Sequence, residues 1–374
     1  MKPFSLCIVS PHAAPALRSR YGLGSDGYFG GAEVQATLLG AGLAARGHRV
    51  TFVCRGEGTT PGRETIGPID VLLIPPPALA PGRLAPAQNL MAALARADAD
   101  LYYQRCALPL TGLVAWHCRR RHKPFIFAVA NDRDLDGRAK AILGRFRFAI
   151  YRYGLRTARQ IVVQTKQQME LLSTVRQQRA AHIPSAFDLR NVHPRPAPPD
   201  PVVLWVASLL PKKRPFLFLE LARRLPEFPF LAVAQPATDG PLTRRFQEEA
   251  DRLQNVECAG RVPHHEMGGL YARATLLLNT SEAEGVPNTF LEAWAREIPV
   301  VSTGIDPDGV IQRLNLGRVA PEQDLALSVK RFLLDPAALQ AAGRAGRRYV
   351  LENHGLESFL DRWEDLLARE SRRA

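Results

Sequence analysis

The chain alternates short apolar runs with helix-length segments, and this alternation fills both halves of the sequence. In the first half the runs are Phe4–Ser10, Arg49–Cys54, Asp70–Ile74, Asp100–Gln104, Pro124–Val129 and Gln160–Gln164. Runs that stay apolar along most of their length are typical of parallel strands buried on both faces. The pattern therefore predicts a doubly wound α/β sheet with helices between most of the strands.

The alternation stops in a proline-rich segment and then starts again. Residues 181–201 read AHIPSAFDLRNVHPRPAPPDP, and these prolines exclude both a helix interior and a central strand. Beyond them we predict a helix from about Pro215 and strands at Val202–Ala207, Phe228–Ala234, Val256–Ala259, Thr275–Asn279 and Pro299–Ser302. The sequence thus predicts a first domain at 1–183, a connection at 184–201 and a second α/β domain at 202–354.

The C-terminal segment 355–374 has the periodicity of a helix. Its apolar residues Phe359, Trp363, Leu366 and Leu367 recur at a spacing that places them on one face. A helix with one apolar face needs a partner that buries it. We expect this helix to pack back onto the first domain.

Composition narrows the classes of protein that fit. A length of 374 residues suits two domains of roughly 150–200 residues, and no apolar run approaches the roughly 18 residues of a membrane-spanning helix. No signal peptide is evident after Met1. The five cysteines are scattered without a CxxC pair, which argues against disulfides and zinc and favours a cytoplasmic location. The formal net charge of +13 predicts an anionic partner: nucleic acid, an acidic membrane or a phosphorylated substrate.

Residues 281–294, SEAEGVPNTFLEAW, place two carboxylates around the start of a predicted helix. Pro287 fits the first helical turn, which leaves Glu284 in the loop and Glu292 inside the helix. The backbone N–H groups of 285–288 favour an anion such as phosphate, whereas the carboxylates favour neutral hydroxyl groups. Phosphate flanked by hydroxylated rings is the chemistry of a nucleotide sugar.

Four stretches resemble the retaining glycosyltransferases of family four. They are FGGAEVQATLLGAGLAARGHRV, LLPKKRPFLFLELARRLP, VPHHEMGGLYARATLLLNTS and EGVPNTFLEAWAREIPVVST, and they occur in the family's order. The resemblance implies the GT-B fold, two doubly wound Rossmann-like domains that face each other across a cleft. It also implies sugar transfer with retention, without a metal or another cofactor, from a nucleotide-sugar donor to a hydroxyl of a glycan or lipid-linked acceptor.

The resemblance also implies a role for each matching residue. Glu284 is expected to accept from hydroxyls of the donor sugar, Glu292 to bind the ribose, and Lys213 to lie on the diphosphate. The other expected donor-binding residues are Gly30 and Gly31 in the first domain, Lys212 and Arg214 beside Lys213, and the turn Gly285, Val286, Pro287, Asn288 and Thr289. None of these roles needs the acid and base pair of a hydrolase.

The chain departs from the family at two positions. Ser208 stands where the family has an arginine before the lysine, so Lys212, Lys213 and Arg214 are expected to share that charge. A histidine that often follows the fifth predicted strand is absent, and Asn131 or Asp132 occupies its place. Asp132 is the candidate for orienting the acceptor or handling its proton.

The segment from Arg138 to Arg159 is strongly basic. On a continuous helix, Arg138, Arg145, Arg152, Arg156 and Arg159 would form one stripe beside Ile142, Phe146, Ala149, Ile150 and Tyr153. Such a stripe is either a solvated basic edge or a surface for anionic lipid headgroups. The second interpretation places the protein peripherally on the inner face of a membrane.

Other interpretations stay open at this stage. The charge also fits a nucleic-acid-binding protein, although no RNA-recognition or helix-turn-helix signature accompanies it and nucleic acid is not the expected partner. A nucleotide-sugar epimerase or a phosphorylase could use the same architecture. His264 and His265 suggest a metal, but no third ligand at a suitable spacing is visible. By family habit the expected setting is cell-envelope or exported polysaccharide biosynthesis.

Overall fold

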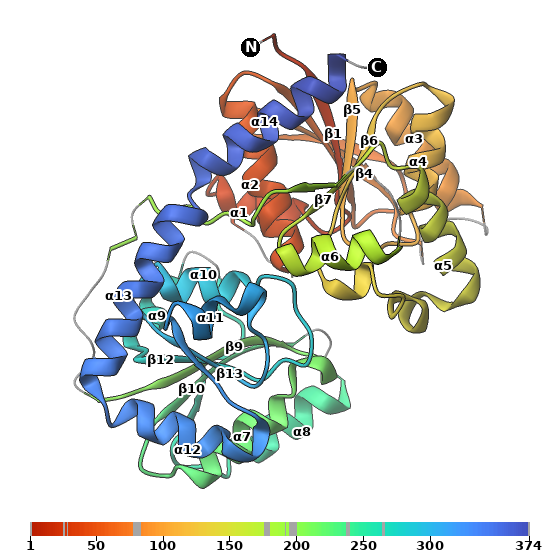
Figure 1. Ribbon diagram of the computed structural model, residues 1–374. Helices are drawn as coiled ribbons and strands as arrows, with labels where there is room; N and C mark the ends of the chain where they lie inside the picture. The colour runs from red at the N-terminus through yellow and green to blue at the C-terminus, as the bar shows by residue number, and fades with distance from the viewer. Residues whose placement is uncertain are drawn as a thin grey trace. The chain divides into compact units, whose positions relative to one another are not determined.

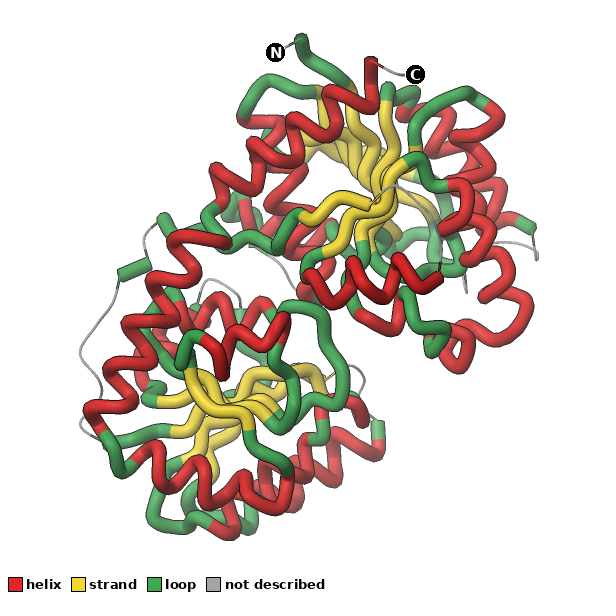
Figure 2. Tube along the Cα trace, in the orientation of Figure 1, coloured by secondary structure: helices red, strands yellow, loops and turns green. Residues whose placement is uncertain are grey.

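The computed structural model describes residues 2–24, 27, 29–77, 84–175, 180–190, 192–193, 200–236, 240–263 and 266–372. The chain forms two compact units: Met1–Ala186 together with Leu356–Ala374, and Phe187–Gly355. Each unit is a wholly or mostly parallel sheet covered by helices (Figure 1, Figure 2). The predicted fold class, two doubly wound Rossmann-like α/β domains, is confirmed. That they face each other across a cleft stays a prediction.

The first unit contains an eight-stranded sheet within the described residues, in the order β3-β4-β2-β1-β5-β6-β7-β8. The strands are β1 (Ser5–Val9), β2 (Arg49–Arg55), β3 (Gly62–Ile66), β4 (Ile69–Ile74), β5 (Leu101–Arg105), β6 (Phe125–Ala128), β7 (Gln160–Val163) and β8 (Ala180–His182). The described pairings are parallel except for that of β3 with β4. Strand β1 pairs with both β2 and β5, so the direction of winding reverses there.

The first unit's helices lie on both faces of its sheet. They are α1 (Ala14–Arg20), α2 (Gly31–Ala45), α3 (Ala85–Ala97), α4 (Thr111–Arg120), α5 (Ala139–Thr157), α6 (Lys166–Val175) and α14 (Leu356–Arg372). Alternation along β1 separates the two cores. Leu6 and Ile8 pack with α1, α2 and α14, whereas Cys7 and Val9 pack with α3, α4, α5 and α6.

The second unit contains a six-stranded parallel sheet, in the order β11-β10-β9-β12-β13-β14. Its strands are β9 (Val203–Leu209), β10 (Phe230–Pro236), β11 (Val256–Cys258), β12 (Leu276–Asn279), β13 (Val300–Ser302) and β14 (Gly317–Val319). Its helices are α7 (Pro215–Arg224), α8 (Pro241–Ala250), α9 (Met267–Arg273), α10 (Asn288–Trp294), α11 (Val310–Arg313), α12 (Glu322–Leu333) and α13 (Pro336–Asn353). Here winding reverses at β9, which pairs with both β10 and β12.

The predicted connection 184–201 is partly packed into the two units. Ser185 and Ala186 are buried in the first unit. The side-chain amide of Gln35 donates a hydrogen bond to the carbonyl oxygen of Ala186 and accepts one from its N–H. Phe187 and Leu189 pack on the core of the second unit. Residues 191 and 194–199 lie outside the described residues.

Helix α14 belongs to the first unit although it follows the second in sequence. The predicted apolar face is buried there: Phe359, Trp363, Leu366 and Leu367 join the same core cluster as Tyr103 of β5. The rings of Trp363 and Tyr103 meet edge to face, with centroids 5.3 Å apart. The last two residues, 373 and 374, lie outside the described residues.

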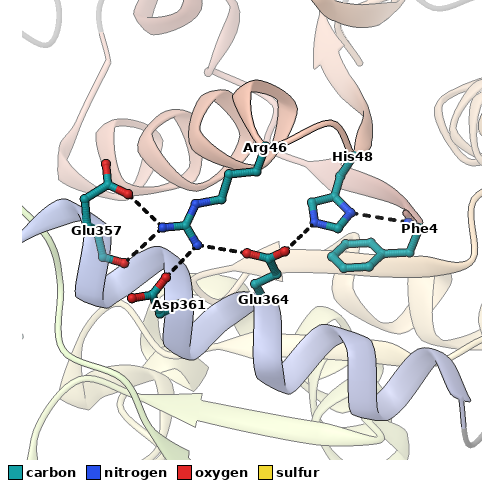
Figure 3. A network of polar contacts seen from close by, with 6 residues as sticks. All are labelled: Phe4, Arg46, His48, Glu357, Asp361 and Glu364. Atoms are coloured by element: carbon teal, nitrogen blue, oxygen red, sulfur yellow. Dashed lines mark hydrogen bonds and ion pairs between the residues drawn. The ribbon is translucent and has the colours of Figure 1, made fainter. Parts of the chain in front are cut away.

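Ion pairs reinforce the contact of α14 with the rest of the first unit (Figure 3). The Arg46 guanidinium, just after α2, lies 2.7–2.8 Å from carboxylates of Glu357, Asp361 and Glu364. The second oxygen of Glu364 lies 3.0 Å from Nε2 of His48. One arginine thus connects three turns of α14 to the end of α2.

The basic segment from Arg138 to Arg159 is not one continuous helix, so the predicted single stripe is wrong. Gly144 has φ 74° and ψ 165°, which breaks the helical backbone inside α5. Arg138 precedes the helix and pairs with Asp136, while Arg159 follows it and pairs with Glu370. A left-handed φ is accessible to glycine at little steric cost, which is why the break falls at this residue.

Candidate active site

The reversal of winding at β9 defines where a ligand is expected in the second unit. In open α/β sheets, ligands bind outside the carboxyl ends of the strands at this point. After β9 the chain forms a short 3₁₀ helix, Pro211–Lys213, and after β12 it forms the loop that carries Glu284. The two predicted residues Lys213 and Glu284 therefore follow the two strands that flank the switch point.

Lys213 and Glu284 form an ion pair. Their side chains are 18% and 13% exposed, so the pair is partly shielded and still open to solvent. A partly buried pair is screened less by salt than one on the surface. The structure thus brings the residue expected to bind the diphosphate, Lys213, into direct contact with the residue expected to bind the sugar, Glu284.

Hydrogen bonds fix the two loops that carry this pair. The hydroxyl of Thr280 donates to the carbonyl oxygen of Lys213 at 2.6 Å and accepts from the indole N–H of Trp205 at 2.9 Å. The N–H of Glu282 donates to the carbonyl oxygen of Lys212 at 2.9 Å. Trp205 lies in β9 and is 2% exposed, so these bonds connect the loops to the buried sheet. Thr280 and Trp205 were not predicted as site residues.

Arg214 points to a different carboxylate. It adopts a left-handed backbone with φ 51° at the start of α7, and its guanidinium pairs with Glu322 in the first turn of α12. Of the three adjacent cations expected to share the diphosphate, Lys213 pairs with Glu284 and Arg214 with Glu322.

The turn 285–288 differs from the prediction at one residue. Pro287 precedes the helix as its N-cap, with an extended ψ of 127°, and α10 begins at Asn288. The buried Pro287 ring lacks an N–H, while its carbonyl oxygen accepts from Phe290 at 3.0 Å. Gly285 and Val286 form a bend, and Asn288 and Thr289 open the helix. Because α10 has only seven residues, about two turns, its dipole is short.

Glu292 is held by a buried tyrosine. The phenolic O–H of Tyr271, in α9, donates to Oε2 of Glu292 at 2.6 Å. Burial, together with the charge and the hydrogen bond of Glu292, holds the pKa of Tyr271 well above its ordinary value, so the phenol remains a donor. Cζ of the Arg296 guanidinium lies 5.0 Å from the centroid of the Tyr271 ring. Sequence inspection missed Tyr271, which has no signature of its own and lies 21 residues before Glu292.

In the first unit, Asn131 and Asp132 follow β6. The side chain of Asn131 accepts from the N–H of Arg133 at 3.0 Å and caps a 3₁₀ turn, Asp132–Asp134. Oδ1 of Asp132 accepts from Nε2 of the fully buried Gln168 at 2.9 Å. Asp132 is itself partly exposed, so a buried amide orients a carboxylate that solvent can reach.

The most buried carboxylate of this loop is Asp134, which was not among the predicted residues. It is 8% exposed and accepts from the N–H groups of Ala130 and Asn131 at 2.8 and 3.1 Å. Burial raises the pKa of Asp134, and these hydrogen bonds only partly offset it. The spacing Asn-x-x-Asp is a capping-box signature that the sequence already contains. Asp134 shapes the loop that presents Asp132.

A chain of buried polar groups continues from Gln168. Oε1 of Gln168 accepts from the N–H of Gln164 at 2.9 Å, and the Gln164 side chain accepts from Ser185 at 2.5 Å. Nη2 of Arg105 donates to Ser185 at 3.2 Å. Arg105 ends β5, Gln164 follows β7 and Asp132 follows β6, so the chain runs along the carboxyl edge of the sheet.

Gly30 and Gly31 lie at the start of α2, with Gly30 as its N-cap. The N–H of Gly30 donates to the carboxylate of Glu33 at 2.9 Å, so the third helical residue caps the N-cap backbone. His12 lies near this end of α2; partial burial of its ring and the Arg55 guanidinium lower its pKa, while Glu33 raises it. The structure therefore adds His12, at the carboxyl end of β1, to the residues near the glycine pair.

Among the described residues, no group of three or more His, Cys, Asp and Glu side chains could hold a metal ion. His264 and His265 lie outside those residues. In the same part of the chain, no helix is both long and apolar enough to span a bilayer.

The fold and the site together define a class, the GT-B-type α/β proteins: two doubly wound sheets, with a lysine–glutamate pair at the switch point of the second. Residues 30–186 match the model of the glycosyl transferase 4-like domain, and residues 200–335 match that of the glycosyl transferases group 1. The chain belongs to this glycosyltransferase family.

Individual relatives share parts of the sequence or the whole fold. The chain is 29% identical, over 46% of its length and 50% of the relative, to the GDP-mannose-dependent alpha-(1-6)-phosphatidylinositol monomannoside mannosyltransferase of Mycolicibacterium smegmatis. It is 26% identical to glycosyltransferase 1 domain-containing protein 1 of Xenopus tropicalis, over 37% of this chain and 41% of that protein. The chain thus matches half or less of the length of these relatives. The structure of sucrose-phosphate synthase from Thermosynechococcus elongatus has a TM-score of 0.82 at 19% identity, covering 99% of this chain and 100% of that one.

Proposed function

We propose that the protein transfers a sugar from a nucleotide-sugar donor to a hydroxyl group of a glycan or lipid-linked acceptor, with retention at the anomeric carbon. The observation that carries the proposal is the ion pair of Lys213 and Glu284 at the switch point of the second sheet. In such a donor the diphosphate is joined directly to the sugar. A lysine ammonium group can bind the diphosphate, while an adjacent carboxylate accepts hydrogen bonds from the sugar hydroxyls.

Donor binding exchanges the partners of this pair. The diphosphate replaces Glu284 beside Lys213, and donor sugar hydroxyls replace Lys213 beside Glu284. As the bond to the nucleotide breaks, negative charge grows on the diphosphate. A fixed ammonium group therefore stabilises the transition state more than it stabilises the ground state. Lys213 therefore accelerates departure of the nucleotide, and this role requires no metal or other cofactor.

The remaining predicted residues position the donor and the acceptor. Glu292, oriented by Tyr271, binds the ribose hydroxyls, while the turn from Gly285 to Thr289 approaches the sugar and the diphosphate. Gly30 and Gly31 approach the phosphates from the first unit. Asp132 orients the acceptor hydroxyl or receives its proton.

The acceptor class is supported by one relative and by the family. The name of the Mycolicibacterium smegmatis enzyme states that it uses GDP-mannose and acts on a phosphatidylinositol monomannoside, which is a lipid-linked acceptor. We extend this chemistry to the present chain and place it in cell-envelope or exported polysaccharide biosynthesis. A nucleotide-sugar donor made inside the cell would place the reaction in the cytoplasm.

The test is product analysis with purified protein, a panel of UDP-, GDP- and ADP-sugars, and glycan and lipid-linked acceptors. Glu284→Gln is expected to lower transfer by about a hundredfold, because it replaces one of the two acceptor oxygens with an NH2 donor and removes the negative charge. Glu292→Ala is expected mainly to weaken nucleotide binding. Lys330→Ala, which breaks an exposed pair with Glu227 in the same unit, is the matched control and should leave transfer unchanged.

Two outcomes would overturn the proposal. One is wild-type turnover in Glu284→Gln. The other is thermal stabilisation by oligonucleotides and by none of the nucleoside diphosphates or their sugars, which would favour nucleic acid as the ligand.

A further inference from the structure

The break inside α5 exposes two large apolar side chains that no part of the unit buries. Ile142 is 70% exposed and Phe146 is 79% exposed, one on either side of Gly144. Single exposed apolar residues are common on protein surfaces. Ile142 and Phe146 flank the helix break, and we call the segment 140–147 that carries them the tip.

Exposed cations lie next to Ile142 and Phe146 in sequence. Lys140, Arg145 and Arg147 are exposed, and within the described part of the chain their side chains make no ion pair or hydrogen bond. The sequence from 137 to 160 contains no acidic residue. Exposed positive charge therefore accompanies Ile142 and Phe146 along α5, whereas Arg138 and Arg159 beyond the ends of the helix are paired with carboxylates.

The other half of α5 is firmly packed, so the tip has a rigid base. Gly154 of α5 and Gly112 of α4 let the two helices approach until the backbones touch: a Cβ at Gly154 would lie 2.7 Å from the Thr111 backbone. Tyr151 is 1% exposed and donates to the carbonyl oxygen of Asp134 at 2.7 Å. Figure 1 shows α4 and α5 beside each other in the first unit.

We infer that residues 140–147 dock the protein on a bilayer surface of anionic phospholipid, with Phe146 and Ile142 inserted among the headgroups. An apolar tip alone would favour any apolar partner, and charge alone would favour any anion. Exposed apolar and cationic side chains in one segment match an anionic lipid surface, which offers phosphates at the interface and acyl chains beneath them. Nucleic acid is less suited, because its phosphates would leave Ile142 and Phe146 exposed.

The test is sedimentation of purified protein with vesicles. One set contains only phosphatidylcholine, and the other replaces a third of it with phosphatidylglycerol. Wild-type protein is expected to bind the anionic vesicles, to dissociate from them at high salt, and not to bind the neutral vesicles. The double variants Ile142→Ser with Phe146→Ser, and Arg145→Gln with Arg147→Gln, are each expected to lower the vesicle partition coefficient about tenfold or more.

The matched controls carry the same substitutions elsewhere. Leu334→Ser changes an apolar residue that is 64% exposed, and Arg344→Gln with Arg348→Gln removes two exposed arginines of α13. These variants should bind like wild type. All variants replace exposed side chains, and far-UV circular dichroism will verify that they fold.

Three results would overturn the inference: equal wild-type binding to neutral and anionic vesicles, binding by the tip variants that matches wild type, or loss of oligonucleotide binding in those variants without any vesicle binding. The assay contains no donor. Protein that binds vesicles but transfers no sugar would retain this inference and lose the proposed function.

Discussion

The hydroxyl of Tyr271 donates to Glu292 at 2.6 Å from a position that is fully buried. The bond fixes one oxygen of a carboxylate that is 21 residues away in sequence and lies on a different helix. A hydrogen bond to a charged group contributes about 1.5–3 kcal/mol to the arrangement that it stabilises. Glu292 is therefore preorganised before any ligand arrives.

Tyr271→Phe is expected to weaken nucleoside diphosphate binding about five- to tenfold, because the Glu292 carboxylate loses the donor that orients it. The ring remains, so Arg296 keeps its contact with an aromatic face. Isothermal titration calorimetry with UDP, GDP and ADP measures the change. Tyr349→Phe, which removes a hydroxyl from α13 in the same unit, is the control. Unchanged affinity in Tyr271→Phe would mean that this bond only stabilises the fold.

Sequence patterns located most strands because a buried parallel strand needs a continuous apolar run. Strands β1, β2, β4 to β7 and β9 to β13 fall within two residues of the predictions. The patterns missed β3, whose GRETI sequence contains two charged residues at an antiparallel edge, and β8 and β14, which have only three residues each. They also missed the break at Gly144, since a single glycine inside a helical pattern is usually tolerated.

The candidate active site shows more clearly what sequence patterns cannot predict. The family resemblance indicated Lys213 and Glu284 as separate site residues, but they are 71 residues apart, and only the pairing of β9 with β12 brings them together. Periodicity describes one element at a time and cannot report which loops meet. The N-cap role of Asn131 and the burial of Asp134 could have been predicted from the sequence, because the Asn-x-x-Asp spacing is local.

Trp363 of α14 tests how the last helix contributes to the first unit. Trp363→Ala is expected to lower the free energy of unfolding by about 3–5 kcal/mol, through the cavity left among Phe359 and Tyr103. Trp363→Phe should cost only about 1–2 kcal/mol, because the indole N–H has no partner among the described residues. Trp205→Phe, which removes the bond to Thr280, should cost more than Trp363→Phe. Urea unfolding followed by circular dichroism measures each variant, and equal losses for both Trp→Phe variants would contradict this reasoning.

The Arg46 network predicts a loss of stability in acid. Burial raises the pKa of Glu364, but hydrogen bonds from His48 and Arg46 outweigh it, and the pKa lies below its ordinary value of 4.5. The unfolded state therefore takes up the proton first as pH falls. The contribution of Glu364 is complete above its unfolded pKa and is lost as pH falls through the lower folded value.

Glu364→Gln is accordingly expected to be less stable than wild type at pH 7, by about 1–2 kcal/mol. The difference should shrink as pH falls below 4.5. Urea midpoints from pH 7 down to the onset of acid unfolding measure it. Glu357→Gln, which changes a carboxylate that is 76% exposed, should show a smaller effect. A difference that stays constant with pH would assign the loss to packing instead of charge.

The approach of α4 to α5 predicts opposite effects for two Gly→Ala substitutions. At Gly154 a Cβ would lie 2.7 Å from the backbone of Thr111, so α4 and α5 must separate, and Gly154→Ala is expected to destabilise the protein by about 1–3 kcal/mol. At Gly269, in α9, a Cβ would meet nothing within 4 Å, so Gly269→Ala should be neutral or stabilising by up to about 1 kcal/mol. Urea unfolding compares the two with wild type. A stable Gly154→Ala protein would show that the two helices do not need this close contact, and that the tip at 140–147 does not depend on it for a rigid base.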